Sequence, residues 1–123
     1  MICLDTNYLI RGIAAATSEA EELSDWYRGG EPLITPMPAW FEFLCGPLTK
    51  DQEATARAFL SRIVPFGERE ASESARLFNA IGRDRKYRVD AMIAGTAIAA
   101  DAGLATNNRA DFEPFIPHGL RLL

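Results

Sequence analysis

The sequence predicts an α/β fold, specifically a three-layer α/β/α sandwich around a short parallel sheet of four or five strands. Short apolar runs that suit buried strands alternate along the chain with longer segments of helical periodicity. Neither an internal repeat nor a linker interrupts this alternation, and 123 residues is the usual size of one domain. We therefore expect a single domain over residues 1–123, in which helical crossovers join the parallel strands.

The elements of the first half are predicted from their boundaries. Apolar runs indicate the strands, and capping residues or prolines indicate where the helices begin. Asp5 to Asn7 provide caps for the first helix, Thr17 and Ser18 for the second, and Pro36 and Pro38 suit the start of the third. In order, we expect a strand at 2–4, helices at 8–15 and 17–29, a strand at 32–35 and a helix at 36–46.

The second half shows the same alternation. Apolar residues recur at helical spacing from Thr49 to Ile63, and a long apolar helix follows Asp90. Short apolar runs again indicate strands between and after the helices. In order, we expect a helix at 49–63, a strand at 64–66, helices at 72–82 and 89–102, and strands at 104–106 and 120–122.

Four acidic residues stand where a carboxylate is costly unless it has a partner. Asp5 follows the first strand, Glu42 interrupts an aromatic run, Asp90 opens an apolar helix and Asp111 follows a strand and a polar turn. The carboxyl ends of parallel strands form the usual binding crevice, so Asp5 and the segment 107–111 are expected at one edge. Carboxylates in partly dry surroundings repel one another, and a cation is the expected compensation. The set predicts a divalent-metal site.

Each acid also has a structural explanation. Asp5 and Asp90 could cap the helices that they precede, and Asp111 could serve the polar turn in which it lies. Glu42 could form an internal salt bridge, because its helix is apolar nearly all round and such helices are expected to be buried. The metal hypothesis therefore depends on the four residues together.

The net charge of −4 argues against broad electrostatic capture of nucleic acid. One dense basic run, formed by Arg83, Arg85, Lys86 and Arg88, lies directly before Asp90. This run is either a solvated helix end or a local means of steering phosphate groups toward the site.

Several other classes lack their residues. His118 is the only histidine, Cys3 and Cys45 have no zinc-ligand spacing, and no P-loop sequence occurs. Both cysteines lie in apolar runs, so two buried thiols are expected instead of a disulfide. No apolar stretch is long enough to span a bilayer and no signal sequence opens the chain, so we expect a cytoplasmic protein without membrane association.

Four segments of the chain, in this order and at this spacing, form a recognisable set. They are Leu4-Asp5-Thr6-Asn7 with Leu9-Ile10, Glu42-Phe43-Leu44-Cys45-Gly46, Asp90-Ala91-Met92-Ile93-Ala94 with Thr96-Ala97, and Thr106 to Phe112. In these segments the chain resembles the PIN-domain nucleases, and in particular the VapC-like toxins of type II toxin-antitoxin pairs. The resemblance covers almost the whole chain and implies a PIN-like domain over residues 1–123.

The resemblance implies that Asp5, Glu42, Asp90 and Asp111 bind magnesium or manganese and hydrolyse RNA, with structured RNA such as tRNA as a substrate class. It also implies a cognate VapB-like antitoxin as partner and a homodimer, for which Trp26, Tyr27, Trp40 and Phe41 offer apolar candidates. Thr6 resembles the family's small hydroxyl residue beside the site. Some members carry an aspartate where this chain has Asn108, so Asn108 and Asp111 are alternatives for the fourth position.

Two other functions remain open from the sequence. A PIN-like domain without turnover could bind only RNA or a protein. A receiver-type regulatory domain also gathers acids around magnesium, but it needs a lysine late in the chain, and the only lysines here are Lys50 and Lys86.

Overall fold

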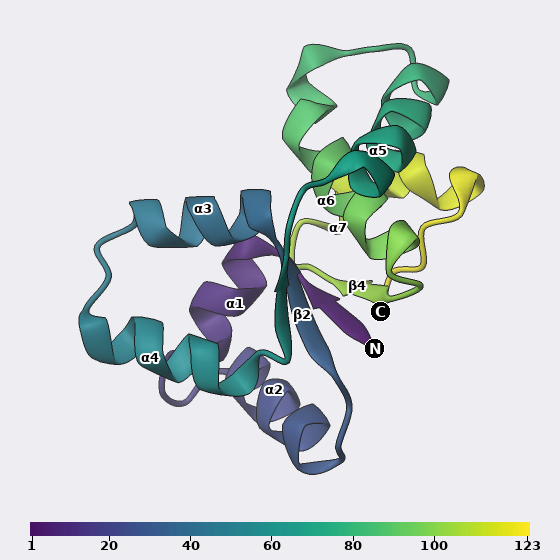
Figure 1. The fold of residues 1–123 in the computed structure, drawn as a ribbon. Helices are drawn as coiled ribbons and strands as arrows, with labels where there is room; N and C mark the ends of the chain where they lie inside the picture. Colours follow the sequence, from purple (N-terminus) through teal and green to yellow (C-terminus); the bar gives the residue numbers. More distant parts are fainter.

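The computed structural model describes residues 1–123 and contains a four-stranded sheet between two layers of helices (Figure 1). The strands are β1 (Ile2–Leu4), β2 (Leu33–Pro36), β3 (Arg62–Val64) and β4 (Gly103–Ala105). Every neighbouring pair is parallel, and the order across the sheet is β3-β2-β1-β4. The predicted α/β fold with a short parallel sheet is confirmed.

The strand order creates a switch point beside β1. The chain runs outward from β1 through β2 to β3, and it then returns to place β4 on the opposite side of β1. In open α/β sheets, a crevice forms at such a point, outside the carboxyl ends of the strands. Asp5 and Thr106 are the residues that directly follow β1 and β4, so both lie beside this switch point, at the carboxyl edge of the sheet.

Helices cover both faces of the sheet, with α1, α2 and α4 on one side and α5 and α6 on the other in Figure 1. Their bounds are α1 (Thr6–Gly12), α2 (Ser18–Arg28), α3 (Met37–Cys45), α4 (Lys50–Phe59), α5 (Glu68–Ala80), α6 (Arg88–Ala99) and α7 (Arg109–Phe112). The short 3₁₀ helix η1 (Arg85–Tyr87) directly precedes α6, and a second, η2 (Glu113–His118), directly follows α7.

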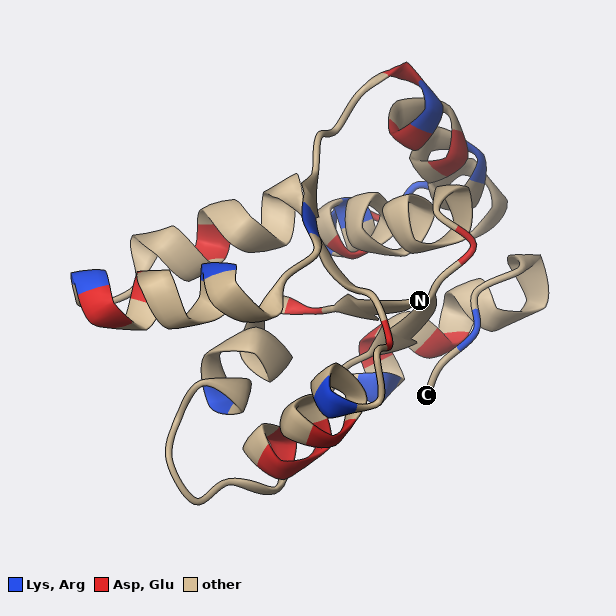
Figure 2. Ribbon diagram, turned by 60° about the horizontal axis from the view of Figure 1, so that its bottom comes forward, with Lys and Arg blue, Asp and Glu red and all other residues tan.

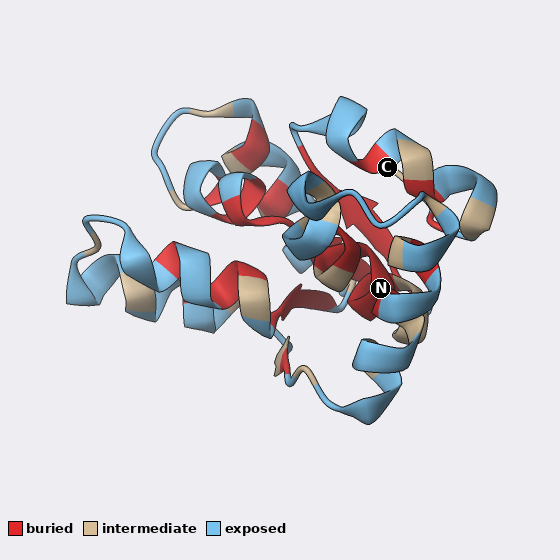
Figure 3. Cartoon of the chain, turned by 90° about the horizontal axis from the view of Figure 1, so that it is seen from above, coloured by how far each residue is buried: buried red, intermediate tan, exposed pale blue.

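Two hydrophobic cores correspond to the two faces of the sheet. Ile2 and Leu4 pack into the core of α1 to α4, whereas Cys3 between them packs into the core of α5 to α7. This alternation follows from the strand period of two residues. All three residues of β1 are buried, as expected for a parallel strand that is covered on both faces (Figure 3).

Several predicted boundaries are wrong for reasons of tertiary pairing. The chain leaves α4 at Leu60, where the Ser61 amide donates to the Leu33 carbonyl at 2.8 Å, so the third strand is 62–64 and not 64–66. The helix expected from residue 72 begins earlier, at Glu68. The strand expected at 120–122 is reduced to one isolated bridge between Leu104 and Leu122.

Helices α5 and α6 approach closely at a glycine. A Cβ atom on Gly95 would lie 2.2 Å from the Ser74 Oγ and 2.7 Å from the Ser74 Cα. Backbone atoms cannot yield as a flexible side chain can, so only glycine allows this contact. The close contact fixes α6, and therefore Asp90 in its first turn, against the rest of the domain.

The cysteines match the sequence-based expectation only in part. Both cysteines are free thiols, but only Cys3 is buried, so the expectation of a buried Cys45 is wrong. Burial raises the pKa of the Cys3 thiol. None of the helices has both the length and the apolar character that crossing a membrane requires.

Candidate active site

Asp5 is the most constrained of the four acids. Its residue is only 5% exposed, and its backbone amide donates to the Ala105 carbonyl of β4 at 3.1 Å. The carboxylate accepts two hydrogen bonds of 2.8 Å, from the Thr6 amide at Oδ1 and from the Thr106 hydroxyl at Oδ2. The capping explanation is therefore true of Asp5, because one oxygen caps α1, while the other oxygen accepts from the residue that follows β4.

The charge on Asp5 is disfavoured despite these bonds. Burial raises the pKa of Asp5, and the two hydrogen bonds from Thr106 and Thr6 oppose that rise. The carboxylate of Asp111 raises the pKa further by like-charge repulsion.

Thr106 was not singled out from the sequence, although it bonds directly to Asp5. The register of β1 and β4 pairs Leu4 with Ala105, which brings the next residue of each strand side by side. The Thr106 hydroxyl also accepts a hydrogen bond from the Asn108 amide at 3.0 Å. A hydroxyl residue at the carboxyl end of the strand predicted at 104–106 is the signal that could have identified it, once the strand order is known.

Asp90 lies in the first turn of α6 and is half-buried. Partial burial is the main cause that raises its pKa to about 6. Repulsion from Asp111, Asp5 and Glu42 adds to the rise, so this carboxylate senses all three other acids. No side-chain hydrogen bond caps α6, so the capping explanation of Asp90 is not supported.

Glu42 corrects an expectation about α3. The helix was expected to be buried all round, but Glu42 is exposed and its neighbour Phe41 is 65% exposed. No salt bridge involves Glu42, so the internal ion pair considered from the sequence does not form. Its pKa is raised by partial loss of hydration and then by repulsion from Asp5.

Asp111 and Asn108 lie on the segment that follows β4. Asn108 is the residue before α7, its side chain makes no capping bond, and its carbonyl accepts from the Asp111 amide at 3.0 Å. Both residues are exposed, and Asp111 is the one whose charge reaches Asp5 and Asp90.

Thr6 lies beside Asp5 with its hydroxyl already engaged. The residue is buried, and its Oγ1 donates to the Ala39 carbonyl at 3.4 Å. Thr6 thus links the start of α1 to α3, the helix that carries Glu42.

The four acids repel one another without a neutralising partner. None of the salt bridges of the protein involves Asp5, Glu42, Asp90 or Asp111. No group of three or more ligating side chains is close enough to enclose a metal ion directly. Magnesium commonly takes only one or two carboxylates and keeps several waters, so this all-oxygen, uncompensated donor set fits such an ion.

An apolar hollow of about 390 Å³ opens between α3 and α6. Glu42 lies at its edge, and its apolar lining residues are Met37, Pro38, Phe41, Phe66, Val89 and Met92. Of the aromatic residues considered for association, Phe41 and Tyr27 are exposed whereas Trp40 is buried in the core.

Two of the four basic side chains before Asp90 have polar partners within the chain. Arg83 donates to the Asn79 side chain, and Lys86 pairs with Asp84 at 3.8 Å, whereas Arg85 and Arg88 make no ion pair. Figure 2 shows charged residues of both signs spread over several elements.

One family model and several solved structures match this chain. A family model described as PIN domain matches residues 2–113. A comparison with curated protein sequences gave no match.

Solved structures share the fold over nearly the whole chain. A chain of VapBC2 from Rickettsia felis, bound to a promoter DNA fragment, is 23% identical with a TM-score of 0.73, and the match covers 100% of this chain and 98% of that one. DNA-bound VapBC from Salmonella typhimurium gives 21% identity and a TM-score of 0.75, over 99% and 96% of the two chains. A toxin-antitoxin complex from Klebsiella pneumoniae gives 26% identity and a TM-score of 0.70, over 92% and 91%.

Proposed function

We propose a nuclease function from one premise: the chain belongs to the PIN domain family, whose model matches residues 2–113. Members of this family are generally nucleases. The specific proposal is a magnesium- or manganese-dependent endoribonuclease that hydrolyses phosphodiester bonds of structured RNA such as tRNA. The observation that carries it is the mutual repulsion of Asp5, Glu42, Asp90 and Asp111, which no cationic side chain offsets.

The four carboxylates would have different roles, which follow from their surroundings. Asp5, held by Thr6 and Thr106, offers a fixed carboxylate with little rotational freedom. Asp90, Glu42 and Asp111 are more open, so they can orient water by accepting its hydrogen bonds. Positive charge that offsets their repulsion would favour the state in which all of these carboxylates are ionised.

A bound divalent ion would lower the pKa of a coordinated water and offset the charge on the phosphate. The protein contributes the carboxylate geometry and a half-buried site in which electrostatic interactions are stronger than in bulk water. Asn108 or Asp111 would supply the fourth position, and the exposure of both leaves either free to move toward substrate.

Substrate contact must be local because the net charge is −4. Arg85 and Arg88 lack ion-pair partners and come just before Asp90 in the chain, so we assign them to steering RNA phosphates. Loss of these charges should weaken RNA binding in a salt-dependent manner.

The proposed biological role is that of the toxin in a toxin-antitoxin pair. Similar chains belong to VapBC complexes and to a complex that is itself described as toxin-antitoxin. An acidic crevice without internal cations suits an arginine or lysine side chain from a VapB-like antitoxin. The exposed apolar surface around Phe41 is the proposed homodimer contact.

The test is RNA cleavage by the purified protein. Wild-type protein should cleave tRNA with magnesium or manganese and stop in chelator, while Asp5→Asn and Asp90→Asn should lose cleavage and remain folded. Asp51→Asn, which changes an exposed acid in the first turn of α4, is the matched control. Cleavage by Asp90→Asn at the wild-type rate would exclude the proposed site.

One alternative function predicts a different result. A family member without turnover would bind RNA or protein in a gel-shift assay, and it would leave RNA intact with either metal. RNA end-mapping after brief expression of wild type and of Asp5→Asn would distinguish the two and would identify the target.

A further inference from the structure

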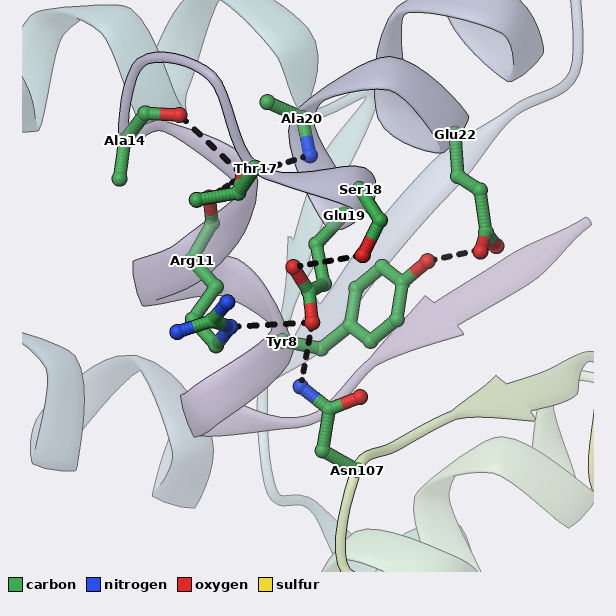
Figure 4. A network of polar contacts seen from close by, with 9 residues as sticks. All are labelled: Tyr8, Arg11, Ala14, Thr17, Ser18, Glu19, Ala20, Glu22 and Asn107. Atoms are coloured by element: carbon green, nitrogen blue, oxygen red, sulfur yellow. Dashed lines mark hydrogen bonds and ion pairs between the residues drawn. The ribbon is translucent and has the colours of Figure 1, made fainter.

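A second acidic residue, outside the quartet, is buried at the junction of α1, α2 and the segment after β4. Glu19 is only 8% exposed and lies in the first turn of α2. Its Oε1 accepts from the Arg11 Nε at 3.0 Å and from the Asn107 Nδ2 at 3.1 Å (Figure 4). The Ser18 hydroxyl donates to its Oε2 at 3.3 Å.

Arg11 keeps this carboxylate charged. The hydrogen bond from Arg11 is the main cause that lowers the pKa of Glu19, and the bond from Asn107 contributes in the same direction. Unlike the quartet, Glu19 therefore has its own cation and does not need a bound ion.

The partner of Glu19 lies next to the acidic site. Asn107 stands between Thr106, whose hydroxyl donates to Asp5, and Asn108, whose amide donates back to Thr106. Glu19 is separated from Asn107 by 88 residues in sequence, so this bond joins α2 to the segment that carries the site.

We infer that Glu19, fixed by Arg11, is a positioning residue that holds Asn107 and thereby places Thr106 and the following segment against Asp5. This role presupposes the nuclease function proposed above. The alternative is an ion pair that only joins α1 to α2, and such a pair would contribute little to stability because Arg11 is largely exposed.

Three substitutions separate these roles. Asn107→Ala removes the link to the segment but leaves the Arg11–Glu19 pair intact. Glu19→Gln keeps an acceptor for Asn107 and removes the charge. Tyr8→Phe is the matched control, because it removes the 2.7 Å bond from Tyr8 to Glu22 at the same α1–α2 junction without touching the segment.

The first readout is Mn²⁺ binding by calorimetry together with RNA cleavage. Asn107→Ala should weaken Mn²⁺ affinity or lower kcat roughly ten-fold, as is typical when a residue that orients a ligand is lost. Glu19→Gln should lie between Asn107→Ala and wild type, and Tyr8→Phe should match wild type. The thermal midpoint of Asn107→Ala should stay close to that of Tyr8→Phe.

The second readout needs neither metal nor RNA. Hydrogen exchange at the Asn108 amide, which donates to Thr106, should accelerate in Asn107→Ala and remain slow in Tyr8→Phe. Unchanged exchange in Asn107→Ala would overturn the positioning role, as would wild-type cleavage by that variant. If the wild-type protein neither binds Mn²⁺ nor cleaves RNA, the proposed nuclease function is wrong. The positioning role of Glu19 in catalysis would then be wrong as well.

Discussion

The Thr106 hydroxyl donates a 2.8 Å hydrogen bond to the carboxylate of Asp5, a residue 101 positions away in the sequence. Both residues directly follow neighbouring parallel strands, so the bond is a consequence of the β1–β4 pairing. Through it, the least exposed acid of the quartet is held to the segment that carries Asn108 and Asp111.

Thr106→Val should therefore lower the stability of the fold and release Asp5 from the segment after β4. Valine keeps the shape of threonine but cannot donate to Asp5, and a hydrogen bond to a charged group contributes roughly 1.5–3 kcal/mol. We expect a loss of about that size in the free energy of unfolding at pH 8, measured by urea denaturation. Thr106→Ser keeps the hydroxyl and should retain most of the stability; equal losses in the two variants would contradict the role of the bond.

The apo protein should lose stability as pH rises through the titration of Asp90. The folded state raises the pKa of Asp90 from 3.8 to about 6, so the folded protein binds the proton more tightly than the unfolded chain does. The stabilisation that protonated Asp90 provides is complete below pH 3.8 and is lost above about pH 6. Since the carboxyl is half open to solvent, we expect on the order of 1 kcal/mol.

Asp90→Asn isolates this contribution. In chelator, the variant should exceed wild type in unfolding free energy at pH 7.5 and match it near pH 4. Asp51→Asn should show no such difference. If the difference in unfolding free energy between wild type and Asp90→Asn is the same at both pH values, the pH dependence does not come from Asp90.

Manganese should stabilise the folded protein. An ion that binds only the folded state adds about 2.7 kcal/mol when its concentration is one hundred times its Kd. The thermal midpoint of wild type should therefore rise by several degrees with excess Mn²⁺, and that of Asp5→Asn should not. Calcium is a useful comparison, since its larger radius suits more ligands at longer distances.

Gly95→Ala should destabilise the fold by forcing α5 and α6 apart. The added methyl would press on the backbone of Ser74, and overpacking of this kind typically costs about 1–3 kcal/mol. Gly46→Ala is the control, because its methyl would meet only the Phe43 carbonyl at 3.6 Å, an ordinary contact. Chemical denaturation of both variants checks the difference.

Phe41→Glu should prevent self-association if α3 and α6 form the dimer contact. Phe41 is 65% exposed on the rim of the apolar hollow, and a carboxylate there could not be buried without a partner. Sedimentation equilibrium should show a monomer for Phe41→Glu. Tyr27→Glu, at another exposed aromatic residue, should sediment as wild type does; dissociation by Tyr27→Glu alone would move the contact to α2.

The sequence predicted which segments meet at the carboxyl edge of the sheet better than it predicted the bounds of the helices and strands. Asp5 and the segment after β4 could be placed together because strand ends of a parallel sheet meet at one edge. Periodicity failed at residues 60–63, where pairing with β2 draws the chain out of α4, and no local pattern reports that pairing. The bond between Glu19 and Asn107 was equally invisible, because it depends on how α2 packs against a distant loop.

The apolar character of α3 led to an error of a different kind. A helix rich in aromatic residues was expected to be covered, but hydrophobicity does not say whether the cover comes from the same chain. Trp40 and Phe43 are buried within the domain, whereas Phe41 and Leu44 remain exposed. Phe41 and Leu44 mark the side of α3 that the rest of this chain leaves uncovered, and the sequence alone could not identify that side.

The position of β4 beside β1 also affects the order in which the molecule is completed. Strand β1 can pair with β2 early, over a short separation, but its other edge waits for residues 103–105. Contacts over such a separation carry a larger loop-closure cost and form slowly. A growing polypeptide thus carries Asp5 and Glu42 long before it has Thr106, so the bond that holds Asp5 to the segment after β4 cannot form until that strand and the residue after it have been made.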